Sequence, residues 1–216
     1  MERGAKTKQE LLQEGNKKVG THHKLFMIKA IYWNIRGVRS KKAIHRLKHL
    51  IHINNAQFVA IFEPFISKEK IDGYRNFLGF QACISNINGQ IWCFWKNHLN
   101  TTIIVNEDQH ITIKFNEGFD KSNIFITAVY AKCTAAERKD LWDSLENISM
   151  SINSPWCIGG DFNVIADPGE KLGGKSHRIY RSLEFVNCLN NCGVTDLGFT
   201  GPKYTWCNNR RPRKRI

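Results

Sequence analysis

Short apolar or alternating runs, repeated along the chain from Lys29 onward, constrain the fold of this sequence more than any other feature. Turn signals rich in Gly, Asn and Asp, such as Asn88-Gly89, separate the runs, and this combination predicts β-strands. The expected strands cover Ala30–Ile35, Phe58–Phe62, Phe80–Ile84, Ile91–Trp95, Thr101–Val105, Ile111–Phe115, Ile124–Tyr130, Trp156–Gly159 and Tyr204–Cys207. Many short strands must bury their apolar faces against a second sheet or against helices.

Three amphipathic segments interrupt these runs and predict helices. They cover Lys41–Asn54, Ala135–Ile152 and Ile179–Cys192. A capping-box pattern at Thr134–Glu137 fixes the start of the second helix, and Gly193 ends the third. Strands separated first by helices and later by short turns predict an α/β (α+β) architecture, in which two β-sheets pack together and helices cover their outer faces.

The size and composition of the chain predict one domain with a leader. The chain has 216 residues, 42% of them hydrophobic, which is enough for one substantial core. Residues 1–28 are polar and charged and predict a flexible basic leader, so the folded domain is expected over residues 29–216. No apolar run reaches the roughly 18 residues of a membrane span, and no secretory signal is visible. We therefore expect an intracellular protein without a membrane partner.

The charge distribution favours a polyanionic partner. The net charge is +13, with six Lys/Arg against three Glu in residues 1–28 and six Lys/Arg without an acid in residues 202–216. Such an excess is typical of nucleic-acid binding, although basic tails also serve as solvated termini. Charge alone leaves both interpretations open.

Polar side chains occur where four of the predicted strands end. Each of them has an ordinary structural explanation: a turn Asn, a solvated loop acid, a packed tyrosine ring or a Gly-Gly-Asp turn. Their joint occurrence, in this order, favours a common site at one end of the strands. The four clusters are Trp33–Gly37, Glu63, Tyr130 and Gly159–Asn163.

These residue types suit phosphodiester hydrolysis with a divalent cation. Mg²⁺ prefers a few carboxylate or amide oxygens, and Glu63, Asp161, Asn34 and Asn163 supply such groups. Hydrolysis needs a base that aligns water, donors to the phosphoryl oxygens and a metal near the leaving oxygen. Asp161, the pair Asn163 and Tyr130, and Glu63 with its ion are expected to fill these three roles.

These residues and their order along the chain resemble the endonuclease/exonuclease/phosphatase superfamily. The residues are Asn34, Glu63, Tyr130, Asp161 and Asn163. The resemblance implies a DNase I-like, four-layer α/β sandwich that works with Mg²⁺ or Mn²⁺. It implies that Glu63 is the metal ligand and Asn34 its supporting ligand. It also implies that Asp161 activates the nucleophilic water, that Asn163 orients Asp161, and that Tyr130 hydrogen-bonds the phosphate.

Longer runs resemble plant LINE-type non-LTR retrotransposon proteins. These runs are Pro155–Asn163, Glu170–Gly174, Asp196–Gly201 and Tyr204–Trp206. The resemblance implies an endonuclease domain that nicks chromosomal DNA in the nucleus and is normally fused to a reverse transcriptase. It places Thr205 near DNA. We expect further DNA contacts from Arg36 and from the basic residues Arg210, Arg211 and Arg213.

Two late elements of such domains do not occur before Ile216: the Asp of an Arg-Leu-Asp-Arg-like strand and a terminal Ser-Asp-His. The resemblance therefore implies a domain without its last strands. Loss of a positioned acid–base group typically costs on the order of 10²-fold to 10⁴-fold in rate, so weak or absent activity is expected. Two alternatives remain open: an inactive nucleic-acid-binding transposon remnant, and a host repair endonuclease or phosphoesterase of the same superfamily.

Overall fold

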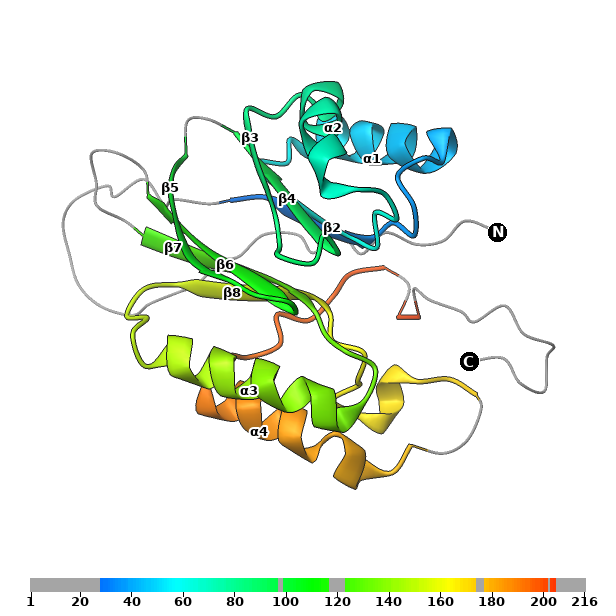
Figure 1. Ribbon diagram of the computed structural model, residues 1–216. Coiled ribbons are helices and arrows are strands. Elements are labelled where there is room, and N and C mark those ends of the chain that lie inside the picture. Colours follow the sequence, from blue (N-terminus) through cyan, green and yellow to red (C-terminus); the bar gives the residue numbers. More distant parts are fainter. Residues whose placement is uncertain (1–27, 97–98, 117–122, 174–176, 202, 205–216) are drawn as a thin grey trace.

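The fold is a four-layer sandwich of two β-sheets with helices on both outer faces (Figure 1). The computed structural model describes residues 28–96, 99–116, 123–173, 177–201 and 203–204. The strands are β1 (Ala30–Asn34), β2 (Phe58–Phe62), β3 (Ala82–Ser85), β4 (Ile91–Trp95), β5 (Asn100–Asn106), β6 (His110–Asn116), β7 (Asn123–Tyr130) and β8 (Trp156–Asp161). The α-helices are α1 (Lys41–Asn54), α2 (Ile71–Leu78), α3 (Ala135–Ser149) and α4 (Leu183–Asn191).

Each sheet has four strands and ends in one parallel pair. The first sheet has the order β1-β2-β4-β3, with β1 and β2 parallel, and the second has the order β5-β6-β7-β8, with β7 and β8 parallel. β8 contacts both β1 and β2. The two parallel pairs therefore face each other across the sandwich, and their carboxyl ends meet at the same end of it.

The strand β2 packs against the second sheet with one face and against the helices with the other. All five of its residues are buried and apolar, which is typical of a strand covered on both faces. Phe58 faces the second sheet, where its ring centroid lies 5.8 Å from that of Phe115. Val59 and Ile61 belong to the cluster beneath α1 and α2. Sheet packing and helix packing thus both depend on β2.

A polar layer lies between the second sheet and α3. His110 is fully buried, and its Nε2 lies 3.0 Å from Ser144 Oγ and 3.1 Å from Glu107 Oε2. Behind it, the hydroxyls of Thr112 and Thr127 are 2.9 Å apart. Burial lowers the pKa of His110 below its usual value. These partners satisfy buried polar groups that would otherwise destabilise the interface.

Several sequence predictions need correction at element boundaries. The structure forms α2, which the sequence does not predict because Gly73 weakens an eight-residue helix. The helix predicted over Ile179–Cys192 is instead a 3₁₀ turn, Ile179–Arg181, followed by α4. Ser182 separates the two segments, because its buried hydroxyl donates to the Ile165 carbonyl.

Smaller shifts affect the ends of several strands and of α3. The strand predicted from Phe80 begins at Ala82, the strand predicted to end at Gly159 continues to Asp161, and α3 ends at Ser149 rather than Ile152. The strand predicted over Tyr204–Cys207 lies outside the described residues except for Tyr204, which is not in a strand. Residues 1–27, most of the predicted leader, also lie outside them. None of the helices in the described ranges is long and apolar enough to cross a membrane.

Two glycines allow β8 to approach its neighbours. A Cβ on Gly159 would lie 2.8 Å from the ring of Tyr32 on β1. A Cβ on Gly160, whose φ is +148°, would lie 1.9 Å from the Val129 carbonyl oxygen on β7. Both contacts are closer than side chains tolerate, so glycine is required where β8 carries Asp161 to the end of the sheet.

We expect Gly160→Ala to destabilise the fold by roughly 3 kcal/mol or more, because it adds both backbone strain and a steric overlap. Gly73→Ala is the matched control. A Cβ on Gly73, inside α2, would have no other atom within 4 Å, so this substitution should stabilise the fold by about 0.5–1 kcal/mol. Urea denaturation of both variants measures the difference. Equal stabilities would show that β8 does not need the glycine.

Candidate active site

Two carboxylates share one amide donor at the carboxyl ends of the parallel pairs. Asn34, the last residue of β1, donates from Nδ2 to Glu63 Oε1 at 2.9 Å and to Asp161 Oδ2 at 3.0 Å. Because both partners are acceptors, the amide must present its nitrogen to them. Asn34 Oδ1 then points away from these bonds and is buried without a hydrogen-bond partner.

Strand register explains this convergence. Asn34 pairs with Phe62, so Glu63 follows directly beside the end of β1. Tyr130 and Asp161 are register partners at the ends of β7 and β8. Strand ends from two sheets thus bring together residues up to 127 positions apart. The convergence expected from strand-end placement is therefore found in the structure.

Tyr130 completes the link between the sheets. Its hydroxyl donates to Glu63 Oε1 at 2.8 Å, and its ring stacks on Phe62 with centroids 6.1 Å apart. Burial raises the pKa of Tyr130 well above its usual value of 10.0, and the neighbouring Glu63 and Asp161 carboxylates act in the same direction. The phenol therefore stays protonated near neutral pH and remains a donor.

Asn163 lies in the turn that follows β8. Its backbone N–H donates to Asp161 Oδ1 at 3.1 Å, and its side-chain Nδ2 donates to the Ala131 carbonyl at 2.6 Å. Each oxygen of Asp161 therefore accepts one hydrogen bond, from Asn34 or from Asn163. These two bonds hold the carboxylate in a fixed orientation.

Arg36 lies beside Glu63 in the loop after β1. Its Nε is 3.6 Å from Glu63 Oε2, and its side chain is 42% exposed. Arg36, Glu63 and Asn163 all have left-handed backbone conformations, with φ near +50°. Such conformations are unfavourable for residues with side chains and concentrate at functional sites.

Two buried side chains support the site although the sequence gives no sign of them. Arg138 on α3 donates from one nitrogen to the carbonyls of Lys132, Cys133 and Asn163, at 3.1, 2.9 and 3.3 Å. Gln109 accepts from the Lys132 N–H at 2.7 Å and donates to the Glu137 carbonyl. Together they bind the loops after β7 and β8 to α3. An arginine in a charged helix face gives no sequence signal of this burial.

The remaining predicted DNA contacts fall in the C-terminal segment. Thr205, Arg210, Arg211 and Arg213 lie outside the described residues. They stay predictions.

Glu63, Asp161 and the side-chain oxygen of Asn34 are the groups here that suit a cation. Among the described residues, His, Cys, Asp and Glu side chains form no cluster of three or more that could hold a metal. A site with two carboxylates, an amide oxygen and water fits Mg²⁺, which keeps several waters and uses few protein ligands. It differs from the usual zinc site, in which His or Cys supplies most of the ligands.

Comparison with known proteins assigns the family. The chain belongs to the endonuclease/exonuclease/phosphatase family, whose model matches residues 31–216. No curated protein sequence matches the chain. The two sheets of four strands with flanking helices agree with the DNase I-like fold.

Solved structures support the same fold. The endonuclease domain of TRAS1, a telomere-specific non-LTR retrotransposon, is 16% identical and aligns over 79% of this chain and 75% of that one, with a TM-score of 0.58. The AP endonuclease LMAP from Leishmania major is 14% identical over 76% of this chain and 66% of that one, with a TM-score of 0.59. At these identities the likeness shows the fold alone.

The human Nocturnin catalytic domain is 17% identical over 62% of this chain, but its TM-score of 0.45 is too low to add to the fold assignment. The chain spans less than two thirds of that domain, at 64%, and of the Leishmania enzyme, at 66%.

Proposed function

We propose that this chain is a divalent-metal-dependent phosphodiesterase that nicks DNA as the endonuclease domain of a LINE-type retrotransposon. The observation that supports it best is the cluster of Asn34, Glu63 and Asp161, in which two carboxylates share one amide nitrogen. Two acids held this close suit a cation and a water-activating base better than they suit a structural role.

Glu63 and Asn34 would hold Mg²⁺ or Mn²⁺. The fit rests on Asn34 Oδ1, a buried acceptor without a hydrogen-bond partner, because such an oxygen is costly unless a donor or cation faces it. When bound, the cation would supply positive charge at the phosphate and the leaving oxygen.

Asp161 is the proposed base that takes a proton from the attacking water. Its orientation is fixed by the Asn34 amide and the Asn163 backbone N–H, so little reorganisation is needed. Tyr130 donates to Glu63 in the absence of substrate and can turn its hydroxyl to a phosphate oxygen. Its raised pKa keeps the proton available for this bond.

The retrotransposon assignment rests on four sequence runs: Pro155–Asn163, Glu170–Gly174, Asp196–Gly201 and Tyr204–Trp206. The likeness to the TRAS1 domain is compatible with a retrotransposon endonuclease. The likeness to an AP endonuclease is compatible with a host repair enzyme. We favour the transposon because the resemblance covers several separate runs. In this proposal the partners are DNA and a fused reverse transcriptase, and the enzyme works in the nucleus.

Nicking of supercoiled plasmid in MgCl₂ tests the proposed reaction. Asp161→Ala should lower the nicking rate on the order of 10²-fold or more, because it removes the base. Asp140→Ala, an exposed acid on α3, is the matched control and should leave the rate unchanged. Chelation by EDTA should stop nicking. Activity that survives both EDTA and Asp161→Ala would refute the mechanism.

A second candidate function is nucleic-acid binding without cleavage. The described histidines lie away from the carboxylates: His110 contacts Ser144, His177 contacts Ser182, and the others are on α1. Within the described part of the chain, the site thus offers no histidine to protonate the leaving oxygen. A wild-type chain that binds DNA but does not nick it in the same assay would favour this candidate.

A basic segment that begins at the site supports a nucleic-acid partner in either case. Residues 36–54 carry six Lys/Arg and no acid, and they include Arg36 and all of α1. The first turn of α1 holds Lys41 and Lys42 without an acidic residue. Cations at a helix N-terminus oppose the helix dipole, so this arrangement costs stability and favours a function in binding anions.

We therefore expect the double variant Lys41→Glu/Lys42→Glu to change stability and binding in opposite directions. The free energy of unfolding should rise by about 0.3–1 kcal/mol per site. DNA binding should weaken, and the slope of log K against log salt should become shallower by about 0.9 for each lysine that contacts a phosphate. Lys139→Glu, exposed on α3, is the control. Unchanged affinity and salt slope would exclude α1 from the DNA interface.

A further inference from the structure

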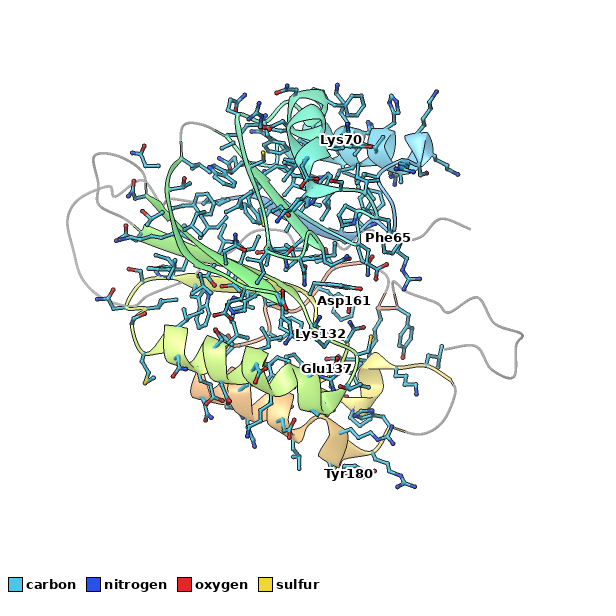
Figure 2. The ribbon with its side chains drawn as sticks, in the orientation of Figure 1. Phe65, Lys70, Lys132, Glu137, Asp161 and Tyr180 are labelled. Atoms are coloured by element: carbon cyan, nitrogen blue, oxygen red, sulfur yellow. The ribbon has the colours of Figure 1, made fainter. Side chains whose placement is uncertain are left out.

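Phe65 is a large aromatic residue exposed at the edge of the site. It follows Glu63 by two residues, and 59% of its surface is exposed. In the view of Figure 2, the labelled Asp161 lies between Phe65 and Lys132. Within the part of the chain that the structure describes, the Phe65 ring stacks on no other ring. Among the described residues, ring stacking therefore does not account for a phenylalanine at this position.

The backbone holds Phe65 in a fixed but unfavourable conformation. Its φ is +53°, in the left-handed region that a bulky residue rarely adopts. The N–H of Gly37 donates to the Glu63 carbonyl at 2.8 Å, and that of Val38 donates to the Pro64 carbonyl at 3.0 Å. These bonds tie the Phe65 loop to the loop after β1. Strain that is kept by surrounding hydrogen bonds indicates a position that is set for a purpose.

The Phe65 ring packs against Gly37. A Cβ on Gly37 would lie 3.7 Å from Phe65 Cδ2, so one edge of the ring packs over the Gly37 backbone. Arg36, one residue earlier, has a side chain that is 42% exposed. An exposed ring thus packs on the residue that follows Arg36, whose side chain is also exposed and lies beside Glu63. Aromatic rings combined with cations along a backbone path are what single-stranded nucleic acid recognises.

We propose that Phe65 is a base-stacking residue, and that it contacts an unpaired or unstacked base of the nucleotide beside the phosphodiester bound at Glu63 and Asp161. This inference rests on the proposed function. Arg36 contacts the phosphate on the Phe65 side, and Lys132 does so on the opposite side of Asp161. A base inside an intact duplex has both faces covered by its neighbours. The site therefore selects DNA whose base at this position is single-stranded or easily unstacked.

Binding to a short fluorescent oligonucleotide tests the proposal. The probe is a single strand of about 12 nucleotides that carries 2-aminopurine, a base whose fluorescence is quenched by stacking. All chains carry Asp161→Ala, so the strand stays intact during titration in MgCl₂. The compared substitutions are Phe65→Ala, Phe65→Leu and Phe65→Trp. Tyr180→Ala is the matched control, because Tyr180 is 54% exposed and lies far from Asp161 in Figure 2.

Phe65→Ala and Phe65→Leu should each raise Kd about 5-fold to 150-fold and remove the quenching, because both lack a ring face. Phe65→Trp should keep both the affinity and the quenching. Tyr180→Ala should leave both unchanged. Because the Phe65 ring is exposed, its replacement leaves the core intact, and equal melting temperatures of the variants confirm this.

The outcomes separate this inference from the proposed function. A parent chain that binds neither single-stranded nor duplex DNA overturns both. A parent chain that binds DNA, with Phe65→Ala equal to Tyr180→Ala, overturns the stacking role alone. Affinity and quenching retained by Phe65→Leu also overturn it, because an apolar contact without a ring would then suffice.

Discussion

The hydrogen bonds from the Asn34 amide to Glu63 and Asp161 join the two sheets at the point where like charges would otherwise repel. Asn34 and Glu63 lie at strand ends of the first sheet and Asp161 at a strand end of the second, so these bonds form only if β1 and β8 face each other across the sandwich. That approach in turn needs Gly159, which leaves room for the ring of Tyr32 on β1, and Gly160 lets β8 lie against β7. The packing of the two sheets and the geometry of the site thus depend on the same contacts, so a change in either disturbs the other.

The site is also where the backbone is least relaxed. In the described part of the chain, five non-glycine residues have positive φ, and four of them lie in the loops around the carboxylates: Arg36, Glu63, Phe65 and Asn163. Each costs on the order of 1 kcal/mol or more, which is large against the stability of a typical domain. The Arg138 and Gln109 bonds to the neighbouring loops offset this strain. The backbone conformations that hold the Glu63 and Asp161 loops in place therefore lower the stability of the fold.

Local sequence patterns predict the residues at the strand ends. They do not predict features that depend on which side chains the fold buries. The ends of β1, β2, β7 and β8 are visible as apolar runs that stop at a polar residue, so the sequence alone groups Asn34, Glu63, Tyr130 and Asp161. The sequence does not reveal α2, because Gly73 hides a spacing of Ile71, Tyr74 and Phe77 that packs on the core. Arg138 and Phe65 escape prediction for a different reason: a buried arginine and an exposed phenylalanine reverse the usual preferences of their residue types, and only tertiary structure reveals that.

We propose that Glu63 and Asn34 hold a divalent cation beside Asp161. The most direct measurement is the anomalous difference density of crystals grown with MnCl₂, because it locates the ion without relying on activity. We expect one peak in contact with the Glu63 carboxylate and beside the Asn34 side chain, lost in crystals of Glu63→Gln. Density elsewhere on the chain, or a peak that persists unchanged in Glu63→Gln, would contradict it.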